Sequence, residues 1–327
     1  MNTQQAYRYE LKPNNKQRTL LAKHVGAARF AWNWALSRRI DRLEKNEGKE
    51  RFSDARTDHR EWNLWKRENA PWVYEVSKCA PQESFRDLDR AFANFWRGRK
   101  AERKVGFPRF KGKGRADSCR FSTGAIKALG SHVQLPRIGR VRVKEGTAVK
   151  GRILSATISR EADRWFVSFT VERQREVAAT RDQGLDVGID LGVVSFAVLS
   201  DGTELRSPGA LKRGLKRLRR LQRRHSRKEK GSSNRRKSAV RLGRLHRRIS
   251  NQRRDFLHKA TTELAKTKRA IIVEDLAVRS LSASARGTRE NPGRKVRSKS
   301  GLNRSILDQG WGEFRCDQTQ DGLFSGR

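Results

Sequence analysis

Long apolar runs are missing from this 327-residue sequence. No stretch approaches the roughly 20 apolar residues that a membrane-spanning helix needs. No apolar core of a secretory signal follows Met1 either. These two absences argue against an integral membrane protein and against a membrane partner, so we expect a soluble protein of the cytoplasm.

Cysteine is also scarce. The three cysteines, Cys79, Cys119 and Cys316, are far apart, odd in number, and include no C-x-x-C pair. Neither a zinc site nor a disulfide framework can be argued from this spacing. We expect unreactive thiols in a reducing compartment.

Acidic residues are few relative to basic ones. The sequence has 35 Asp and Glu against 76 Lys and Arg, which gives a formal charge of +41. A charge of this size says little about the fold, but it predicts binding to polyanions. Because the membrane surface is disfavoured, nucleic acid is the expected partner.

The first strongly basic segment is GFPRFKGKGR at residues 106–115. Its glycines and proline predict a loop. A solvated linker is one interpretation, and a loop that follows a nucleic-acid backbone is the other. The interleaved Phe107 and Phe110 favour the second. The predicted contact residues of this loop are Arg109, Lys111 and Lys113.

The second basic segment, residues 211–260, has 21 Lys and Arg but only two acids. Apolar residues recur at helical spacing on both sides of a turn at residues 228–234, namely Leu211, Leu215, Leu218 and Leu221, then Leu242, Leu245, Ile249 and Phe256. This pattern predicts a helical hairpin with one apolar face and one cationic face. A solvated charged face normally mixes signs, so we expect phosphate contacts at Arg219, Arg220, Arg223 and Arg224.

Asp190 stands at the centre of the sequence VGIDLGVVSFAVLSDG, which runs from Val187 to Gly202. Alternation predicts a strand that buries Val187 and Ile189 and turns Asp190 to the other face. Asp201-Gly202 is a strong hairpin signal. Taken alone, Asp190 is more typical of a surface residue that ends a buried strand than of a metal ligand.

A second acidic residue at a strand end favours the interpretation of Asp190 as a metal ligand. The apolar run Ala270–Val273 predicts a short strand that ends at Glu274. Carboxylates on two neighbouring strands are the oxygen ligands that hard divalent cations prefer. Two such ions can clamp the attacking and leaving oxygens of a phosphodiester. In a chain this basic, the pair Asp190 and Glu274 predicts a nuclease.

Several segments resemble one family when they are taken in order. These are YRYELKPNNKQRTLL and ARFAWNWAL near the amino end, then GIDLGVVSFAVLSDG with the basic hairpin, IIVEDLAV, and LNRSILDQGWGEFR. Together they resemble the TnpB/OrfB insertion-sequence proteins with their RuvC-type nuclease core, which are transposon-encoded relatives of the type V CRISPR effectors. Single motifs are weak, but their order and spacing from about Tyr7 to Arg315 are specific.

The resemblance implies an α+β multidomain fold. A β-barrel wedge with a helical recognition insert would occupy residues 1–175, with about 15–105 helical; the alternating runs within 118–173 are equally typical of an antiparallel sandwich. A linker at 176–184 would lead to a partial RNase H-like (RuvC) α/β core with the basic helical hairpin at 185–315, and an unrelated tail would follow at 316–327.

The resemblance also implies an activity, which is RNA-guided cleavage of DNA. Asp190 and Glu274 would be catalytic metal ligands, with Mg²⁺ as the ion. The partners would be a guide RNA derived from the transposon end and target double-stranded DNA. The compartment would be the prokaryotic cytosol or nucleoid.

The sequence departs from the family after Arg315. Relatives continue with a strand, a four-cysteine zinc ribbon and a D-R-D-x-N motif that carries a third catalytic aspartate, whereas this chain ends in CDQTQDGLFSGR. We therefore expect an absent zinc ribbon, no bound zinc, and catalysis impaired by a carboxy-terminal truncation. The alternatives are a nuclease-inactive RNA-guided DNA-binding protein or repressor, and a basic RNA-binding protein.

Overall fold

The computed structural model describes residues 2–45, 54–114, 117–174 and 185–320, with no side chains described beyond Arg315. The chain divides into two compact units, Met1–Val177 and Ala178–Arg327, which are treated separately below. The expected linker 176–184 and residues 321–327 of the expected tail lie outside the described residues. In the ranges described, no helix is both long enough and apolar enough to cross a membrane.

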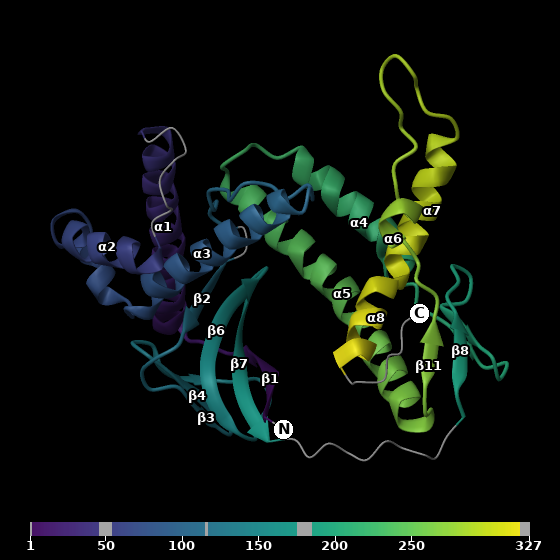
Figure 1. Cartoon of the computed structure of the whole chain (residues 1–327), viewed down its shortest axis with the longest axis horizontal. Coiled ribbons are helices and arrows are strands. Elements are labelled where there is room, and N and C mark those ends of the chain that lie inside the picture. The colour runs from purple at the N-terminus through teal and green to yellow at the C-terminus, as the bar shows by residue number, and fades with distance from the viewer. Residues whose placement is uncertain (1, 46–53, 115–116, 175–184, 321–327) are drawn as a thin grey trace. The chain divides into compact units, whose positions relative to one another are not determined.

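The first unit combines sheets with a group of helices that follows its first strand (Figure 1). Its helices are α1 (Asn15–Lys45), α2 (Ala55–Asn69), the 3₁₀ helix η1 (Pro71–Glu75) and α3 (Cys79–Lys100). Its strands are β1 (Asn2–Leu11), β2 (Ser118–Phe121), β3 (Lys127–Leu129), β4 (His132–Leu135), β5 (Gly139–Arg142), β6 (Arg152–Glu161) and β7 (Arg164–Gln174). The alternating runs in the sequence correctly located the last four of these strands.

The strands of this unit form two antiparallel sheets, with orders β1-β7-β6-β2 and β3-β4-β5. An isolated bridge between Leu11 and Val143 joins them. The expected β-barrel is therefore corrected, because among the described residues β2 and β3 remain unpaired edges and no closed barrel forms. The edge-to-edge pairing that closes a barrel is long-range, and the alternation that predicts each strand carries no information about it.

A buried ion pair fixes α1 to α2. The Arg39 guanidinium donates to the Asp58 carboxylate at 2.9 Å, and both side chains are 1% exposed. Asp89 of α3 accepts a further hydrogen bond from Arg39 at 2.6 Å, and it also accepts from the backbone N–H of Ala55. One cation therefore links three helices.

We expect Asp58→Ala to destabilise the first unit by about 3 kcal/mol, because removing one partner of a buried pair leaves a buried charge partly uncompensated. Denaturant unfolding followed by tryptophan fluorescence measures this. The matched control is Glu161→Ala, which removes an ion pair to Arg8 whose partners are 38% and 41% exposed, and which should cost less than about 1 kcal/mol. Equal effects of the two changes would contradict the assignment of Arg39 as the link.

The second unit has one sheet of four short strands, β8 (Val187–Asp190), β9 (Ala197–Leu199), β10 (Glu204–Leu205) and β11 (Ile271–Val273). Their order is β10-β9-β8-β11, so the first strand in the chain pairs with the second and the fourth. β8 and β9 are antiparallel, as are β9 and β10, whereas β11 runs parallel to β8. The expected turn at Asp201-Gly202 joins β9 to β10, with Gly202 at φ +83°.

The helices of the second unit are α4 (Ala210–Ser226), α5 (Ser233–Thr267), α6 (Val278–Leu281), α7 (Val296–Gln309) and α8 (Trp311–Gln320). One face of the sheet packs against α5, α7 and α8. That core is made by Val187, Ile189, Ala197, Leu199 and Ile271 of the sheet with Leu257, Leu264, Ile306, Trp311 and Phe314 of the helices. The carboxyl end of α5 and strand β11 lie beside β8 in Figure 1.

Candidate nuclease site and nucleic-acid surfaces

The register of the sheet brings Asp190 and Glu274 together. β11 pairs in parallel with β8, with Ile272 opposite Gly188 and Val273 opposite Ile189. Continuing this register by one residue sets Glu274 opposite Asp190, on chains about 4.8 Å apart. Directly paired residues in a sheet point to the same face, so we expect the two carboxylates to share one face if the register continues past Val273.

That face is open within the described residues. On β8 the side chains of Val187 and Ile189 are buried, whereas Asp190 is exposed. The same face carries Val198, which is 40% exposed, and Ile272, which is 58% exposed. A ligand can therefore reach both carboxylates from this side of the sheet, while the other side holds the core.

The loop after Asp190 is held in one shape. Gly192 donates a backbone hydrogen bond to Phe196 at 3.3 Å, and a Cβ at Gly192 would lie 2.8 Å from the carbonyl oxygen of Ser195. Only glycine fits this close approach. The Gln309 side chain also donates to the carbonyl of Val193 at 2.8 Å, which ties the loop to α7.

The donor chemistry of the pair suits a hard cation. Both groups are carboxylates, which are the ligands that Mg²⁺ takes in proteins. Among the described residues, however, no group of three or more His, Cys, Asp or Glu side chains is placed to hold a metal ion. Asp275, next to Glu274, pairs with Arg315 at 2.5 Å. The residues present thus fit magnesium in donor type and supply two carboxylates.

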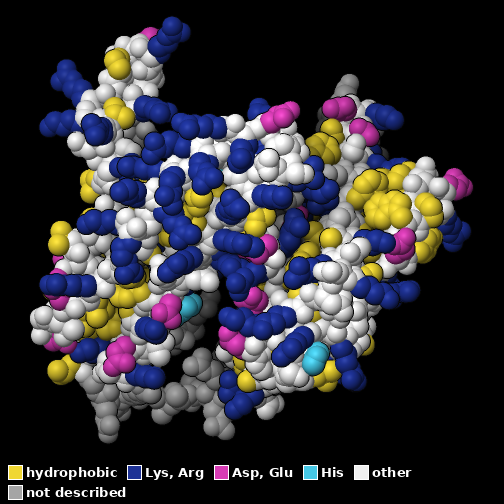
Figure 2. Space-filling model, turned by 180° about the vertical axis from the view of Figure 1, so that it is seen from behind, with side chains coloured by type: hydrophobic (Ala, Val, Ile, Leu, Met, Phe, Trp, Pro, Cys, Tyr) yellow, Lys and Arg dark blue, Asp and Glu magenta, His cyan; other side chains and the backbone are white. Residues whose placement is uncertain are grey.

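Helices α4 and α5 form the predicted basic hairpin. Its apolar face is a small core of Leu218, Leu245 and Ile249, with Leu211, Leu221 and Leu242 packed against it. A Cβ at Gly214 would lie 2.9 Å from the Ile249 side chain, so this glycine permits the close helix contact. The opposite face carries Arg219, Arg220, Arg223 and Arg224, which are all exposed. In the space-filling view, Lys and Arg outnumber Asp and Glu over much of the visible surface (Figure 2).

Asp308 is a functional contact that the sequence did not suggest. It is 7% exposed, and its carboxylate accepts from the backbone N–H groups of Leu211 at 3.0 Å and Lys212 at 3.1 Å. These are free donors at the start of α4, where Gly209 offers no side-chain cap. The acid of α7 therefore caps the helix that presents the arginines. The only sequence signal is an acidic residue among apolar ones in ILDQGW.

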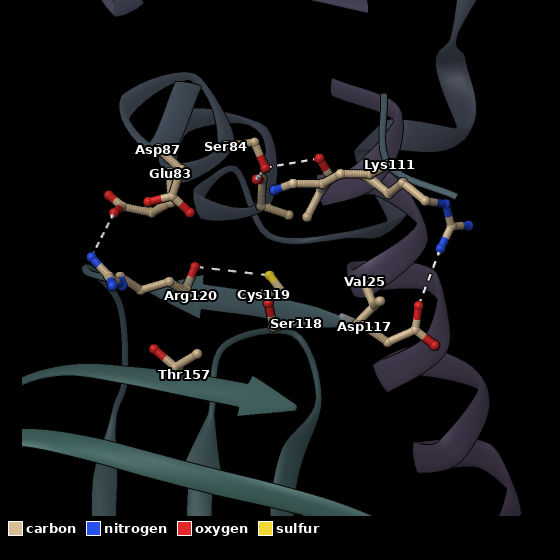
Figure 3. Close-up of a pocket in the computed structure, with 13 residues that line it drawn as sticks. Val25, Glu83, Ser84, Asp87, Lys111, Asp117, Ser118, Cys119, Arg120 and Thr157 are labelled. Atoms are coloured by element: carbon tan, nitrogen blue, oxygen red, sulfur yellow. Dashed lines mark hydrogen bonds and ion pairs between the residues drawn. The ribbon is translucent and has the colours of Figure 1, made fainter. Parts of the chain in front are cut away.

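The three predicted contact residues of the loop at residues 106–114 differ in exposure. Arg109 and Lys113 are exposed. The ammonium of Lys111 instead lies 3.6 Å from the centre of the Trp32 ring, and Lys111 lines a cavity of about 100 Å³ with Glu83 and Asp117 (Figure 3). Burial lowers the pKa of Lys111. Lys111 is thus half-buried, with its side chain turned into the unit.

The two sets of predicted nucleic-acid residues lie in different units. Arg109, Lys111 and Lys113 belong to the first unit, and the four arginines of α4 belong to the second. Asp190 and Glu274 share the second unit with the arginines. Each set is therefore considered on its own.

Comparison with known proteins gives consistent matches. Residues 167–285 match the OrfB_IS605 family, described as "Probable transposase", and residues 1–49 match a family described as a helix-turn-helix domain, HTH_OrfB_IS605. The whole chain is 37% identical to the Escherichia coli K12 protein named "Putative RNA-guided DNA endonuclease InsQ", of which it covers 79%. Over 95% of its length it is 31% identical to a Streptomyces pristinaespiralis protein named "Putative RNA-guided DNA endonuclease", of which it covers 72%.

A solved structure also aligns with the chain. It is a chain of the Cas12f1–sgRNA–target DNA complex, with a TM-score of 0.48 and 11% sequence identity. The alignment covers 100% of this chain and 89% of the other.

Proposed function

The chain belongs to the TnpB/OrfB family of insertion-sequence proteins, and we propose that it is an RNA-guided DNA-binding protein with an impaired nuclease site. The observation that supports the proposal is the parallel register of β8 and β11, which, continued by one residue beyond Val273, would set Glu274 opposite Asp190 on an exposed face of the sheet. A magnesium-dependent phosphodiester site needs such a pair of carboxylates.

The topology of the second unit supports a RuvC-like, RNase H-like core. Three strands follow one another as an antiparallel meander, and the fourth returns parallel to the first after a long helical crossover, α4 and α5. In this arrangement an acidic residue stands at the carboxyl end of each of the two parallel strands, Asp190 in β8 and Glu274 after the edge strand β11. The basic hairpin lies within the crossover itself, so residues for phosphate contact and residues for chemistry come from one continuous segment.

Asp190 and Glu274 are the residues that would hold magnesium. When bound, the ion supplies positive charge for the attacking and leaving oxygens of a phosphodiester. Asp190 is oriented by its place in the β8–β9 pairing, where it lies opposite Val198. Gly192 and Gln309 hold the backbone of the loop that follows Asp190.

Impairment is proposed because the described residues bring only two carboxylates to the site. Mg²⁺ requires near-octahedral geometry and binds weakly when few protein oxygens are available. Guided binding depends on the cationic surfaces and on base pairing rather than on these two acids. Binding of matched DNA is therefore expected to be much less affected than cleavage.

The direct test is guided binding. We expect the protein, co-expressed with RNA transcribed from the transposon end, to bind DNA that matches the guide at least about a hundredfold more tightly than DNA mismatched to the guide. Filter binding in EDTA, which prevents cleavage, measures this. The control is the same protein carrying a scrambled guide, which should show no preference for the matched DNA.

Equal affinity of the guided protein for matched and mismatched DNA would contradict guided recognition. It would favour a basic RNA-binding protein, which the net charge of +41 also permits.

A further inference from the structure

In the described part of the segment between α3 and β2, residues 101–114 and 117, there is no helix or strand, yet its backbone is tied to α1. Asn33 donates from its side-chain amide to the carbonyl of Lys111 at 3.1 Å and accepts from the N–H of the same residue at 2.8 Å. The preceding residue of the helix, Trp32, donates from its indole nitrogen to the carbonyl of Arg109 at 3.0 Å. Three hydrogen bonds from two consecutive residues thus fix residues 109–111.

Two side chains of the loop, Phe107 and Lys111, make contacts within the unit, although Phe107 is still 37% exposed. Phe107 packs edge-on against Phe92 and Phe95, with ring centroids 5.3 Å away from each. Lys111 covers the Trp32 ring and lines the cavity of Figure 3. Both residues therefore serve to hold the loop in place.

The same backbone turns Phe110 outward. Its side chain is 58% exposed, and the cations at Arg109 and Lys113 beside it are also exposed. Because more than half of the Phe110 side chain stays hydrated, it contributes less to the stability of the unit than a buried aromatic ring would.

The acids near this loop already have partners. Asp117 accepts from the N–H of Gly114 at 3.2 Å and pairs with Arg29 at 3.4 Å and with Arg160 at 2.5 Å. Asp87 pairs with Arg90 on the surface of α3. The positive charge of Arg109 and Lys113 is therefore left to attract an anion from outside.

We propose that Phe110 is a stacking platform for an unpaired nucleobase, with Arg109 and Lys113 contacting the phosphates on either side of that base. The inference rests on the proposed function and deepens it, because it names the residue that meets a base in the first unit. Aromatic rings bind bases of any sequence through their π-faces. Since the loop is already ordered by Trp32 and Asn33, binding costs little conformational entropy.

The experiment uses the whole chain and short single strands that contain 2-aminopurine, one RNA and one DNA. Stacking on Phe110 should quench the fluorescent base, and Phe110→Ala should remove the quenching and weaken binding by about fivefold to a hundredfold. Phe110→Trp should restore both. A larger loss on the RNA strand would assign the base to the guide, and a larger loss on the DNA strand would assign it to the target. No loss on either strand would overturn the proposal.

Two matched controls separate stacking from folding and charge. Phe107→Ala should lower the melting temperature, because Phe107 packs against α3, whereas Phe110→Ala should leave it unchanged. Arg109→Met and Lys113→Met should each make the salt dependence of single-strand binding less steep by about 0.7, while Lys111→Met should not. An equal change in the salt dependence for Lys111→Met would contradict the placement of the Lys111 side chain against the Trp32 ring.

Failure of this proposal is distinguishable from failure of the proposed function. Guided recognition is measured on the parent protein as a preference for matched DNA, and it does not require Phe110. A parent that shows this preference while Phe110→Ala binds both single strands normally would overturn only the stacking role.

Discussion

Replacing Arg219, Arg220, Arg223 and Arg224 together by Glu should abolish most of the nucleic-acid affinity of the second unit. All four are exposed on the cationic face of α4, and the apolar face of the helix packs on α5. If each contacts one phosphate, the slope of log affinity against log salt becomes less steep by about 3.6 for duplex DNA. Between 50 and 200 mM salt, the parent should therefore lose about a hundredfold more affinity than the variant.

The measurement is a titration of fluorescent duplex and structured RNA at several salt concentrations. The control variant carries Lys at the same four positions, which keeps the charges and should retain the steep slope. Circular dichroism melting checks that all variants remain folded, since the substituted side chains face away from Leu218 and Ile249. Coincident slopes for the parent and the Glu variant would show that this face of α4 meets something other than phosphate.

The basic hairpin could be predicted because its signal is local. Leucine at helical spacing specifies the buried face, and the turn between the helices follows from residues such as Gly231 and Ser232, the latter capping α5. The structure confirms α4 and α5 where the periodicity placed them. Asp190 and Glu274 were found in the same way, as acids at the ends of short apolar strands.

The contacts that hold the first unit together could not be predicted, because they join residues far apart in the chain. Asn33 pairs with a backbone 78 positions away, and nothing in GFPRFKGKGR shows that Lys111 turns inward while Lys113 stays exposed. Charge alone made the three cations of this loop look equivalent. The prediction of a closed barrel was wrong for the same reason. Closure of a barrel depends on which strand edges pair, and the pattern of a single strand does not specify this pairing.

The aromatic residues of the first unit show what helical spacing can predict and what it cannot. Trp62 of α2 and Phe85 of α3 are fully buried. Trp72, in the same stretch, is 42% exposed because it sits in the short helix η1, whose turn differs from the α-helical period. Exposed apolar residues also occur within the regular helices, such as Phe30 of α1 at 38% and Leu64 of α2 at 65%, so spacing alone does not separate core from surface.

The largest expected effect concerns cleavage. Given guide RNA, Mg²⁺ and a matched target, the protein should cleave far more slowly than its Escherichia coli relative, because no group of three or more possible metal ligands occurs among the residues that the structure describes. Asp190→Ala should remove whatever cleavage remains, because one carboxylate alone cannot hold Mg²⁺ in the geometry that it requires. Guided binding in EDTA should be unchanged, since Asp190 contributes no positive charge to phosphate contacts.

The control is Asp275→Ala, which removes the same charge one residue from Glu274, from an acid that already pairs with Arg315. If cleavage is too slow to follow, the rise in melting temperature with added Mg²⁺ reports the site directly, because ligand binding stabilises the folded state by mass action. Parent and Asp275→Ala should show this rise, and Asp190→Ala and Glu274→Ala should not. Fast cleavage that survives Asp190→Ala would place the reaction elsewhere in the chain and would remove β8 and β11 from the catalytic site.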